Sequence, residues 1–469
     1  MPQKRILIQN PKLVATMDDK GREFTGGHIL VENGVISNLG PEPLHVSGNE
    51  VEVIDASEMV VLPGFINTHH HLYQSLTRNI PRMQDQPLFG WLKNHYQVWR
   101  ELTEEGVFVS AQVGLLELMK SGTTTSSDHL YLFPKQAGTQ LIDAEINAAR
   151  HLGIRFHPTR GSMTLGESAG GLPPDDVVQN EAHIQADIER LLAKYHDTAP
   201  GAMTRLALAP CSPFSVTTEQ MAHTAAFAYE NGLQIHTHLA ETLDEEAFCM
   251  QQYGMRPVDY MESVNWLSEN AWFAHAIHLT DREIVRLGTA GVGMSHCPSS
   301  NMRLGSGIAR IRELLDAGVK VSLGVDGSAS NDSGNMLMEI RNALYLSRLR
   351  EQGFWLNARD VFRMATRGGA AILGRDDIGE LSPGKQADIA LFRIDGLEYA
   401  GAQADPLAAL AFTVRMRPVD YLLVKGEIRI REGNSRLVEK DLIASHNRIA
   451  AEMLTRAGKQ TGIDFLRRD

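Results

Sequence analysis

The chain has 469 residues, too many for one small hydrophobic core, and its 43% hydrophobic and 22% charged residues are typical of a soluble globular protein. Its net charge of −12, without a basic run, argues against nucleic acid or an anionic membrane surface as a partner. No apolar run is long enough for a membrane span, and the N-terminal residues lack the apolar region of a secretory signal. Three scattered cysteines argue against a disulfide framework, so we expect a cytoplasmic protein.

Short strands are predicted near both ends of the chain. Residues 27–36 alternate around an Asn-Gly pair, which is a strong hairpin signal. Residues 379–392 predict a turn and a strand, and residues 419–431 predict a second hairpin. We therefore expect the two ends to pair into one small β-sandwich, with the central part of the chain inserted between its halves.

The predicted domain division has three parts. They are a small β domain of residues 1–60 and 377–440, a barrel of residues 61–376, and a C-terminal helix and tail of residues 439–469. The helix is predicted over residues 439–457, whose apolar residues recur at helical spacing.

The central part repeats an apolar strand, a loop and an amphipathic helix. The predicted strands end at Thr68, Asp128, Arg160, Pro210, His238, His275, His296 and Asp326. The predicted helices cover residues 103–120, 143–152, 182–195, 218–231 and 308–317. These units predict an α/β fold with a (β/α)8 barrel, and a doubly wound parallel sheet is the alternative.

Long loops are expected at the mouth of this barrel. They cover residues 72–99 and residues 162–182. Trp91, in the first loop, is available to stack on a planar ring.

The apolar strand over residues 60–68 runs directly into three histidines. Side chains alternate along an extended segment, so His69 and His71 point one way and His70 points the other. Two imidazoles on one face make half of a metal site. A solubilising histidine run is the alternative, but this run lies inside the chain after a buried-strand pattern.

Further ligand-type residues stand at other predicted strand ends, namely His238, His275 and Asp326. Imidazoles and a carboxylate suit one zinc ion, and iron or manganese also accept these ligands. Asp326 precedes a glycine, so a turn residue is its alternative role. A bridged two-metal site often uses a carbamylated lysine after the fourth strand, and no lysine follows Pro210, so we predict a single metal.

Glu241 lies just beyond the predicted strand that ends with His236, Thr237 and His238. We take His238 as the ligand and His236 as a supporting or packing residue. A carboxyl group at position 241 can move a proton between metal-bound water and a substrate nitrogen. Its alternative role is that of an acidic residue stabilising a helix N-terminus.

Five motifs resemble the amidohydrolase superfamily, in its cytosine, guanine and hydroxytriazine aminohydrolase branch. They are PGFINTHHH, HTHLAE, WFAHAIHL, HCPSSN and VSLGVDGSASND, and the resemblance covers nearly the whole chain. It implies a distorted (β/α)8 barrel with one divalent metal, usually in a homo-oligomer. It also implies roles for six residues: His69, His71, His238 and Asp326 as metal ligands, Glu241 as proton shuttle, and His275 as the residue that orients or deprotonates the water.

The implied activity is hydrolytic deamination of an amino-substituted heterocycle to its oxo form. Asp326, helped by His275, would accept the proton of the metal-activated water, and Glu241 would protonate a ring nitrogen. The products would be the oxo heterocycle and ammonia.

The substrate is narrowed by Gln74 and Cys211. In similar guanine deaminases a glutamine at the spacing of Gln74 contacts the purine edge, and an arginine stands where this chain has Cys211. Residues 126–134 and 159–168 resemble 8-oxoguanine deaminases. We therefore predict conversion of 8-oxoguanine to urate and ammonia. The alternative is a hydroxyatrazine-type s-triazine or pterin aminohydrolase, and a more distant one is a non-catalytic barrel scaffold.

Overall fold

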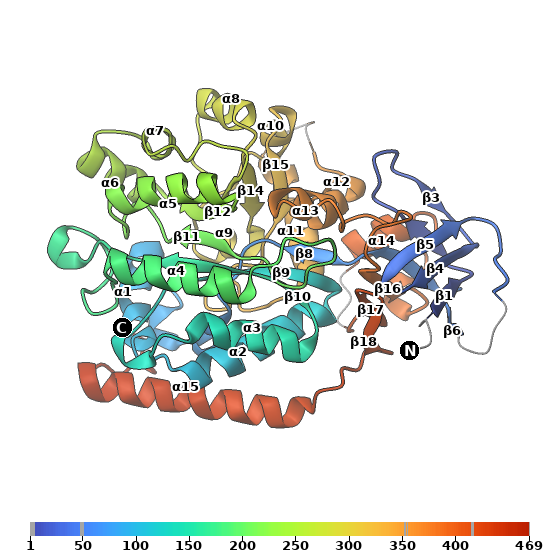
Figure 1. Cartoon of the computed structure of the whole chain (residues 1–469), viewed down its shortest axis with the longest axis horizontal. Coiled ribbons are helices and arrows are strands. Elements are labelled where there is room, and N and C mark those ends of the chain that lie inside the picture. Colours follow the sequence, from blue (N-terminus) through green and yellow to red (C-terminus); the bar gives the residue numbers. More distant parts are fainter. Residues whose placement is uncertain (1–4, 47–50, 351–352, 354, 414–416, 469) are drawn as a thin grey trace.

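The computed structural model describes residues 5–46, 51–350, 353, 355–413 and 417–468. Parallel strands in chain order form the barrel at the centre of Figure 1: β8 (Phe65–Asn67), β9 (Thr123–Leu130), β10 (Arg155–Ser162), β11 (Ala207–Pro210), β12 (Ile235–Leu239), β13 (Ala271–His275), β14 (Gly293–His296) and β15 (Lys320–Leu323). The Thr68 N–H donates to the Leu323 carbonyl over 3.2 Å and so joins the last strand to the first. The predicted barrel is confirmed, and its strands end within three residues of the predicted positions.

The predicted barrel helices are present, with ends within three residues of those expected: α2 (Glu104–Lys120), α3 (Leu141–Leu152), α4 (Glu181–Tyr195), α5 (Thr218–Asn231) and α10 (Ile311–Asp316). Thr103 caps α2 and Thr217 caps α5 by accepting a backbone N–H, and Gly153 ends α3 and Gly232 ends α5 in left-handed conformation. Further helices follow later strands: α6 (Leu243–Tyr253), α7 (Pro257–Ser263), α8 (Asp281–Thr289), α9 (Pro298–Arg303), α11 (Met336–Arg350), α12 (Ala358–Arg363) and α13 (Gly369–Ile372).

The prediction of a long loop over residues 72–99 is wrong. This segment folds into the 3-10 helices η1 (Leu72–Thr77) and η2 (Pro81–Met83) and then α1 (Leu88–Trp99). Trp91, Leu92 and Trp99 are buried at helical spacing, so the apolar face of α1 supports the helix. By contrast, residues 163–180 contain only the short 3-10 helix η4 (Glu167–Ala169), as the second predicted loop requires.

Two further sheets pack together as the predicted β-sandwich. One joins β1 (Arg5–Gln9), β4 (His28–Glu32), β5 (Val35–Gly40) and β6 (Val51–Asp55). The other joins both chain ends: β2 (Leu13–Ala15), β3 (Glu23–Phe24), β7 (Met59–Pro63), β16 (Ile389–Arg393), β17 (Tyr421–Val424) and β18 (Glu427–Arg431). Ile8 and Ile29 of the first sheet are buried with Val61 and Ile389 of the second. The division of the chain into domains at residues 60 and 377 stays a prediction.

Gly64 divides the apolar run that we predicted as one strand. β7 pairs antiparallel with β16 in the sandwich, whereas β8 pairs parallel with β9 in the barrel. A Cβ atom on Gly64 would lie 2.1 Å from the Thr124 side chain, so the crossing between the two sheets requires a glycine. The sandwich therefore delivers the chain straight into the barrel strand that precedes His69.

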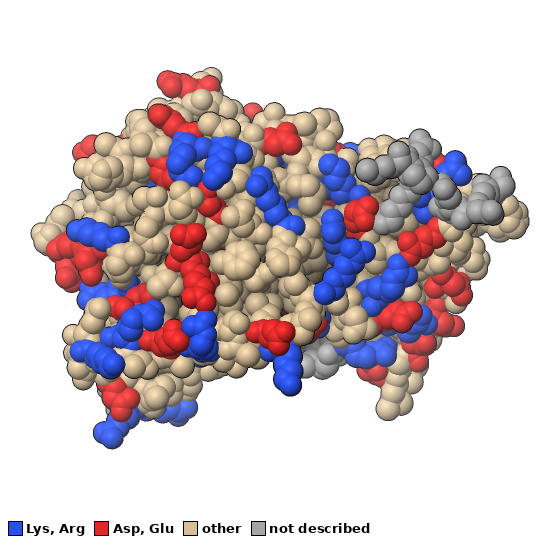
Figure 2. Space-filling model, turned by 60° about the horizontal axis from the view of Figure 1, so that its bottom comes forward, with Lys and Arg blue, Asp and Glu red and all other residues tan. Residues whose placement is uncertain are grey.

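The C-terminal helix α15 (Glu439–Thr461) lies along the outside of the barrel and contacts α1, α2 and η1 (Figure 1). Before it, η6 (Leu397–Tyr399) and α14 (Pro406–Phe412) connect β16 to β17. Among the described residues, no helix is both long and apolar enough to cross a membrane. Figure 2 shows acidic and basic side chains interspersed over one face of the molecule.

Candidate metal centre and active site

The barrel brings the ligand-type residues from separate strand ends together. Asp326 Oδ1 lies 3.3 Å from the Nε2 atoms of both His69 and His71. His71 Nε2 lies 3.2 Å from His238 Nε2. His275 Nε2 is 3.9 Å from Asp326 Oδ2. Residues as far apart in the chain as positions 69 and 326 therefore face one point at the carboxyl ends of the strands, where barrel enzymes build their sites.

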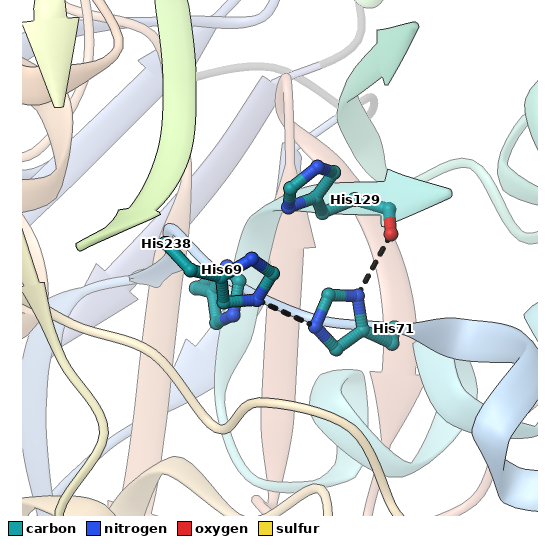
Figure 3. A group of neighbouring side chains, drawn as sticks. All are labelled: His69, His71, His129 and His238. Carbon is teal, nitrogen blue, oxygen red and sulfur yellow. Dashed lines mark hydrogen bonds between the residues drawn. The ribbon is translucent and has the colours of Figure 1, made fainter. Parts of the chain in front are cut away.

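Each of the three clustered imidazoles turns its Nε2 atom inward because its Nδ1 atom is bonded elsewhere. Figure 3 shows this bond for His71, to the His129 carbonyl. The Nδ1 partners are the following: His236 Nε2 at 2.8 Å for His69, the His129 carbonyl at 2.7 Å for His71, and the Cys211 carbonyl at 2.7 Å for His238. His236 donates its own Nδ1 proton to the Trp272 carbonyl, so its Nε2 atom accepts the proton of His69. All three inward nitrogens therefore present lone pairs.

Burial keeps these imidazoles neutral. It lowers the pKa of His69 well below the usual 6.5, lowers that of His71, and lowers that of His238 to about 3. Burial alone would raise the pKa of Asp326, but neighbouring positive charge, that of His275 included, holds this pKa well below 3.8. The cluster thus consists of neutral imidazoles around one carboxylate.

This arrangement fits one divalent metal ion. Two lone pairs 3.2 Å apart, on His71 and His238, repel each other unless a cation lies between them. His69 Nε2 is buried and has no hydrogen-bond partner among the described residues. Three imidazole nitrogens and a carboxylate oxygen form the ligand set that zinc prefers in catalytic sites. Two overlapping groups of the described residues could hold a metal ion, namely His69, His71, His129 and His238, and His69, His275 and Asp326, so the site offers donors for a single-metal centre.

His129 is a further imidazole at this centre that the sequence did not single out. Its ring stacks on His238 with centroids 4.9 Å apart, and Figure 3 shows it beside the three others. Its Nε2 atom is 2.8 Å from the Ala209 carbonyl, and its Nδ1 atom has no partner. His129 lies near the end of β9, whose predicted end, Asp128, is the residue before it. The position of His129 near a strand end is the sequence feature that could have identified it.

Glu241 and His275 stand beside the metal donors. Glu241 Oε2 lies 3.6 Å from His275 Nε2, and Glu241 Oε1 accepts a hydrogen bond from Ser306 over 3.2 Å. Burial raises the pKa of Glu241 above its usual 4.5, which favours a protonated carboxyl. Burial lowers the pKa of His275, but Glu241 and Asp326 outweigh it, so this pKa is raised above 6.5.

The backbone at and next to these side chains is in a strained, left-handed conformation that sets their direction. Ala240, His275 and Asp326 have φ angles of 51°, 71° and 63°, a left-handed region that costs a residue with a side chain about 1 kcal/mol or more. The buried carboxylate of Glu245 accepts the N–H groups of Ala240 and Glu241 over 2.7 and 2.9 Å. It therefore holds the turn that directs Glu241 inward.

A narrow cavity lies over His71, His238 and Asp326. Its other lining residues are Gln74, Leu88, Trp91, Leu92, Tyr96, Tyr131, Cys211, Phe214, Leu304 and Ser330, together with Glu241 and His275. Gln74 Oε1 and Trp91 Nε1 are buried there without a hydrogen-bond partner. Burial raises the pKa of the Cys211 thiol to about 12, so it is neutral. The two sequence-predicted substrate contacts, Gln74 and Cys211, thus line the same cavity as Glu241.

Comparison with known proteins places the whole chain in one family. Residues 60–429 match the amidohydrolase family. The chain is 49% identical to the 8-oxoguanine deaminase of Pseudomonas aeruginosa over 453 residues, which cover 96% of this chain and 99% of the relative. It is 36% identical to the hydroxydechloroatrazine ethylaminohydrolase of Pseudomonas sp. strain ADP, covering 90% of this chain and 89% of that one.

A similar fold occurs in the crystal structure of atrazine chlorohydrolase from Arthrobacter aurescens TC1 in complex with zinc. That structure has a TM-score of 0.90 and 35% sequence identity, and the match covers 95% of this chain and 100% of the other. The chain therefore belongs to the amidohydrolase family, as its sequence motifs predicted.

Proposed function

We propose that this enzyme is a zinc-dependent aminohydrolase that converts 8-oxoguanine to urate and ammonia. The observation that supports it most is the union, in one cavity, of a metal donor set, a buried Glu241 and the unpaired polar groups of Gln74 and Trp91. The 49% identity to a deaminase of this substrate favours the same reaction.

In this proposal His69, His71, His238 and Asp326 hold the metal. A bound zinc ion supplies a water molecule whose pKa is lowered toward neutrality. Zinc is our first choice because three imidazoles and one carboxylate suit it and because a similar structure contains it. Iron accepts the same ligands and is the alternative.

The proton transfers are assigned to two carboxyl groups. Asp326 takes the proton of the attacking water, and His275, 3.9 Å away, stabilises the charge on its Oδ2 atom. Glu241 gives its proton to the ring nitrogen beside the amino-bearing carbon, which makes that carbon electrophilic. The water oxygen bonds to this carbon, and Asp326 then passes its proton to the amino nitrogen. The carbon–nitrogen bond breaks and ammonia leaves, while the C=O bond forms and the remaining hydroxyl proton passes to Glu241.

The far side of the cavity is assigned to recognition of the heterocycle. Gln74 Oε1 accepts a ring N–H, because it is a buried acceptor without a partner. Trp91 Nε1 donates to a ring carbonyl, because it is a buried donor without a partner. Cys211 contributes a small neutral thiol, which leaves room for an oxo group that an arginine at this position would fill.

A substrate panel scored by ammonia release tests the proposal. The panel contains 8-oxoguanine, guanine, a pterin and hydroxyatrazine, and zinc per chain is measured in the same preparation. We expect the highest kcat/KM for 8-oxoguanine, with guanine at least tenfold lower. Activity on hydroxyatrazine without activity on 8-oxoguanine would favour the s-triazine alternative, and preference for the pterin would favour a pterin aminohydrolase. A metal-free, inactive protein of unchanged stability would favour a scaffold.

We also infer the setting in which the enzyme works. Cys211, Cys249 and Cys297 are buried and unpaired, which supports a reducing, cytoplasmic compartment. The interspersed surface charges on the face in Figure 2 favour a small-molecule substrate over nucleic acid or membrane. Homo-oligomeric assembly, the domain division at residues 60 and 377, and the roles of the individual site residues are part of this proposal.

A further inference from the structure

The C-terminal helix α15 contacts the two elements that form the substrate side of the cavity. It packs against η1, which carries Gln74, and against α1, which contributes Trp91 and other apolar lining residues. Its buried residues form one stripe of His446, Ile449, Met453 and Ala457. The residues that offer metal donors, in contrast, lie at the carboxyl ends of barrel strands, and α15 contributes none of these strands. α15 therefore supports the substrate side of the site directly and the metal side only through η1, whose Gln74 N–H donates to the His71 carbonyl over 3.0 Å.

The first anchor of α15 is a buried hydrogen bond to η1. His446 Nε2 lies 2.9 Å from the Ser75 hydroxyl, and the two side chains are 8% and 2% exposed. Ser75 is the residue next to Gln74, which lines the cavity and whose buried Oε1 atom has no hydrogen-bond partner. The bond between His446 and Ser75 thus fixes the short helical turn on which Gln74 stands.

The second anchor joins α15 to the end of α1. Arg456 donates from Nε to Glu101 Oε2 over 3.2 Å and from Nη2 to the Glu101 carbonyl over 2.9 Å. Glu101 is 5% exposed, whereas the Arg456 side chain is 40% exposed, so only the carboxylate of this pair is shielded from water. Beyond the helix, the Phe465 carbonyl accepts the Arg82 N–H over 3.4 Å, which ties the tail to the segment before α1.

We propose that α15 is a positioning strap for substrate binding, with His446 and Arg456 as its positioning residues. The strap sets the places of Gln74 and α1, and so the affinity for the heterocycle, while the proposed metal ligands are held in place mainly by the barrel strands. This inference rests on the proposed function, since it assigns the cavity to a heterocyclic substrate. Substrate affinity is therefore expected to depend on the C-terminal helix, although this helix contacts neither the substrate nor the metal.

The kinetic test uses His446→Ala, Ser75→Ala and the double variant. We expect each single variant to raise KM about tenfold, the value of one lost buried hydrogen bond, with kcat within about twofold and metal content unchanged. The double variant is expected to match the singles because both remove the same contact. Arg448→Ala is the control, since its side chain lies on the same helix and is half exposed. An unchanged KM in His446→Ala, or a parallel loss of zinc and kcat, would overturn the proposal.

A second readout needs no activity. Hydrogen exchange should speed up about tenfold over residues 72–101 in His446→Ala and stay unchanged over β12 and β13. If the exchange rate over residues 72–101 in His446→Ala equals that of the wild type, or rises uniformly along the chain, the proposed role of α15 is wrong. If His446→Ala does not fold, Ser75→Ala carries the same test. Faster local exchange in an enzyme that deaminates no heterocycle would reject the proposed function and leave the strap standing.

Discussion

His71 and His238 face each other through Nε2 atoms that lie 3.2 Å apart, and neither ring has a proton to place between them. Both rings donate their Nδ1 proton to a backbone carbonyl, of His129 and of Cys211. Burial opposes a second proton on either ring, and it lowers the pKa of His238 to about 3. The hydrogen bonds of the folded chain therefore leave two Nε2 lone pairs facing one point, where a cation can bind.

His236 is predicted to control metal affinity without touching the metal. It accepts the Nδ1 proton of His69 and is itself fixed by the Trp272 carbonyl. Loss of such a partner typically costs 10–100-fold in metal affinity, so we expect about that loss in His236→Ala and partial recovery in His236→Gln. Competition with a fluorescent zinc chelator measures it, and His223→Ala, at an exposed position, is the control. Equal zinc affinity in His236→Ala would remove His236 from the centre.

Glu241→Gln is predicted to keep the metal and lose the reaction. Glutamine preserves the shape and the contact with Ser306 but has no proton to give to a ring nitrogen. We expect kcat to fall about 1,000-fold, a value within the usual range for a lost general acid, with zinc content unchanged. Asp244→Asn, at an exposed position three residues away, is the matched control. A Glu241→Gln enzyme with nearly wild-type turnover would exclude the proton-shuttle role.

Gly327 is predicted to make room for Gln74. A Cβ atom at position 327 would lie 1.8 Å from Gln74 Oε1, so Gly327→Ala must displace the carboxamide. We expect KM to rise about tenfold in Gly327→Ala and in Gln74→Ala, and no further in the double variant. Steady-state kinetics measure KM, and zinc content shows whether Asp326, the neighbouring residue, still holds metal. Additive effects in the double variant would show that the two residues act separately.

Glu339 is predicted to make the fold less stable as pH rises. It is fully buried and accepts hydrogen bonds from Ser299 and Asn331, and burial raises its pKa from 4.5 to about 7. Between pH 4.5 and 7 Glu339 keeps its proton in the folded chain but has lost it in the unfolded chain. The free energy of unfolding is therefore greatest below pH 4.5 and falls as pH rises through 7. The full effect is about 3 kcal/mol.

The thermal midpoints of wild type and Glu339→Gln, measured between pH 5 and 8, test this sign. The wild-type Tm should fall relative to that of the variant as pH rises, because glutamine does not titrate. Parallel curves, or a relative rise for the wild type, would contradict a raised pKa.

The barrel and the convergence of its strand ends were predictable from local patterns. β8 and β13 are short apolar runs that lead into histidines, and α2 to α5 each have a capping side chain or a closing glycine. Parallel strands place their carboxyl ends at one rim, so His238 and Asp326 had to come near His71 once the barrel was assumed.

The features that sequence patterns did not predict depend on distant parts of the chain. The split of the apolar run at Gly64 follows from two different partners, β16 and β9, and no local signal separates them. α1 was mistaken for a loop because Pro81 and Pro87 interrupt the segment, whereas its helix is supported by burial of Trp91 and its neighbours. His129 was overlooked because one histidine within a buried strand has no spacing signal.

Zinc stoichiometry measured together with turnover tests the central claim most directly. The enzyme is stripped with a chelator, titrated with zinc, and assayed at each step for bound metal and for ammonia released from 8-oxoguanine. We expect activity to rise in proportion to bound zinc and to be complete at one ion per chain, with none recovered in His238→Ala. Full turnover by the stripped enzyme, or recovery that requires a second ion, would contradict it.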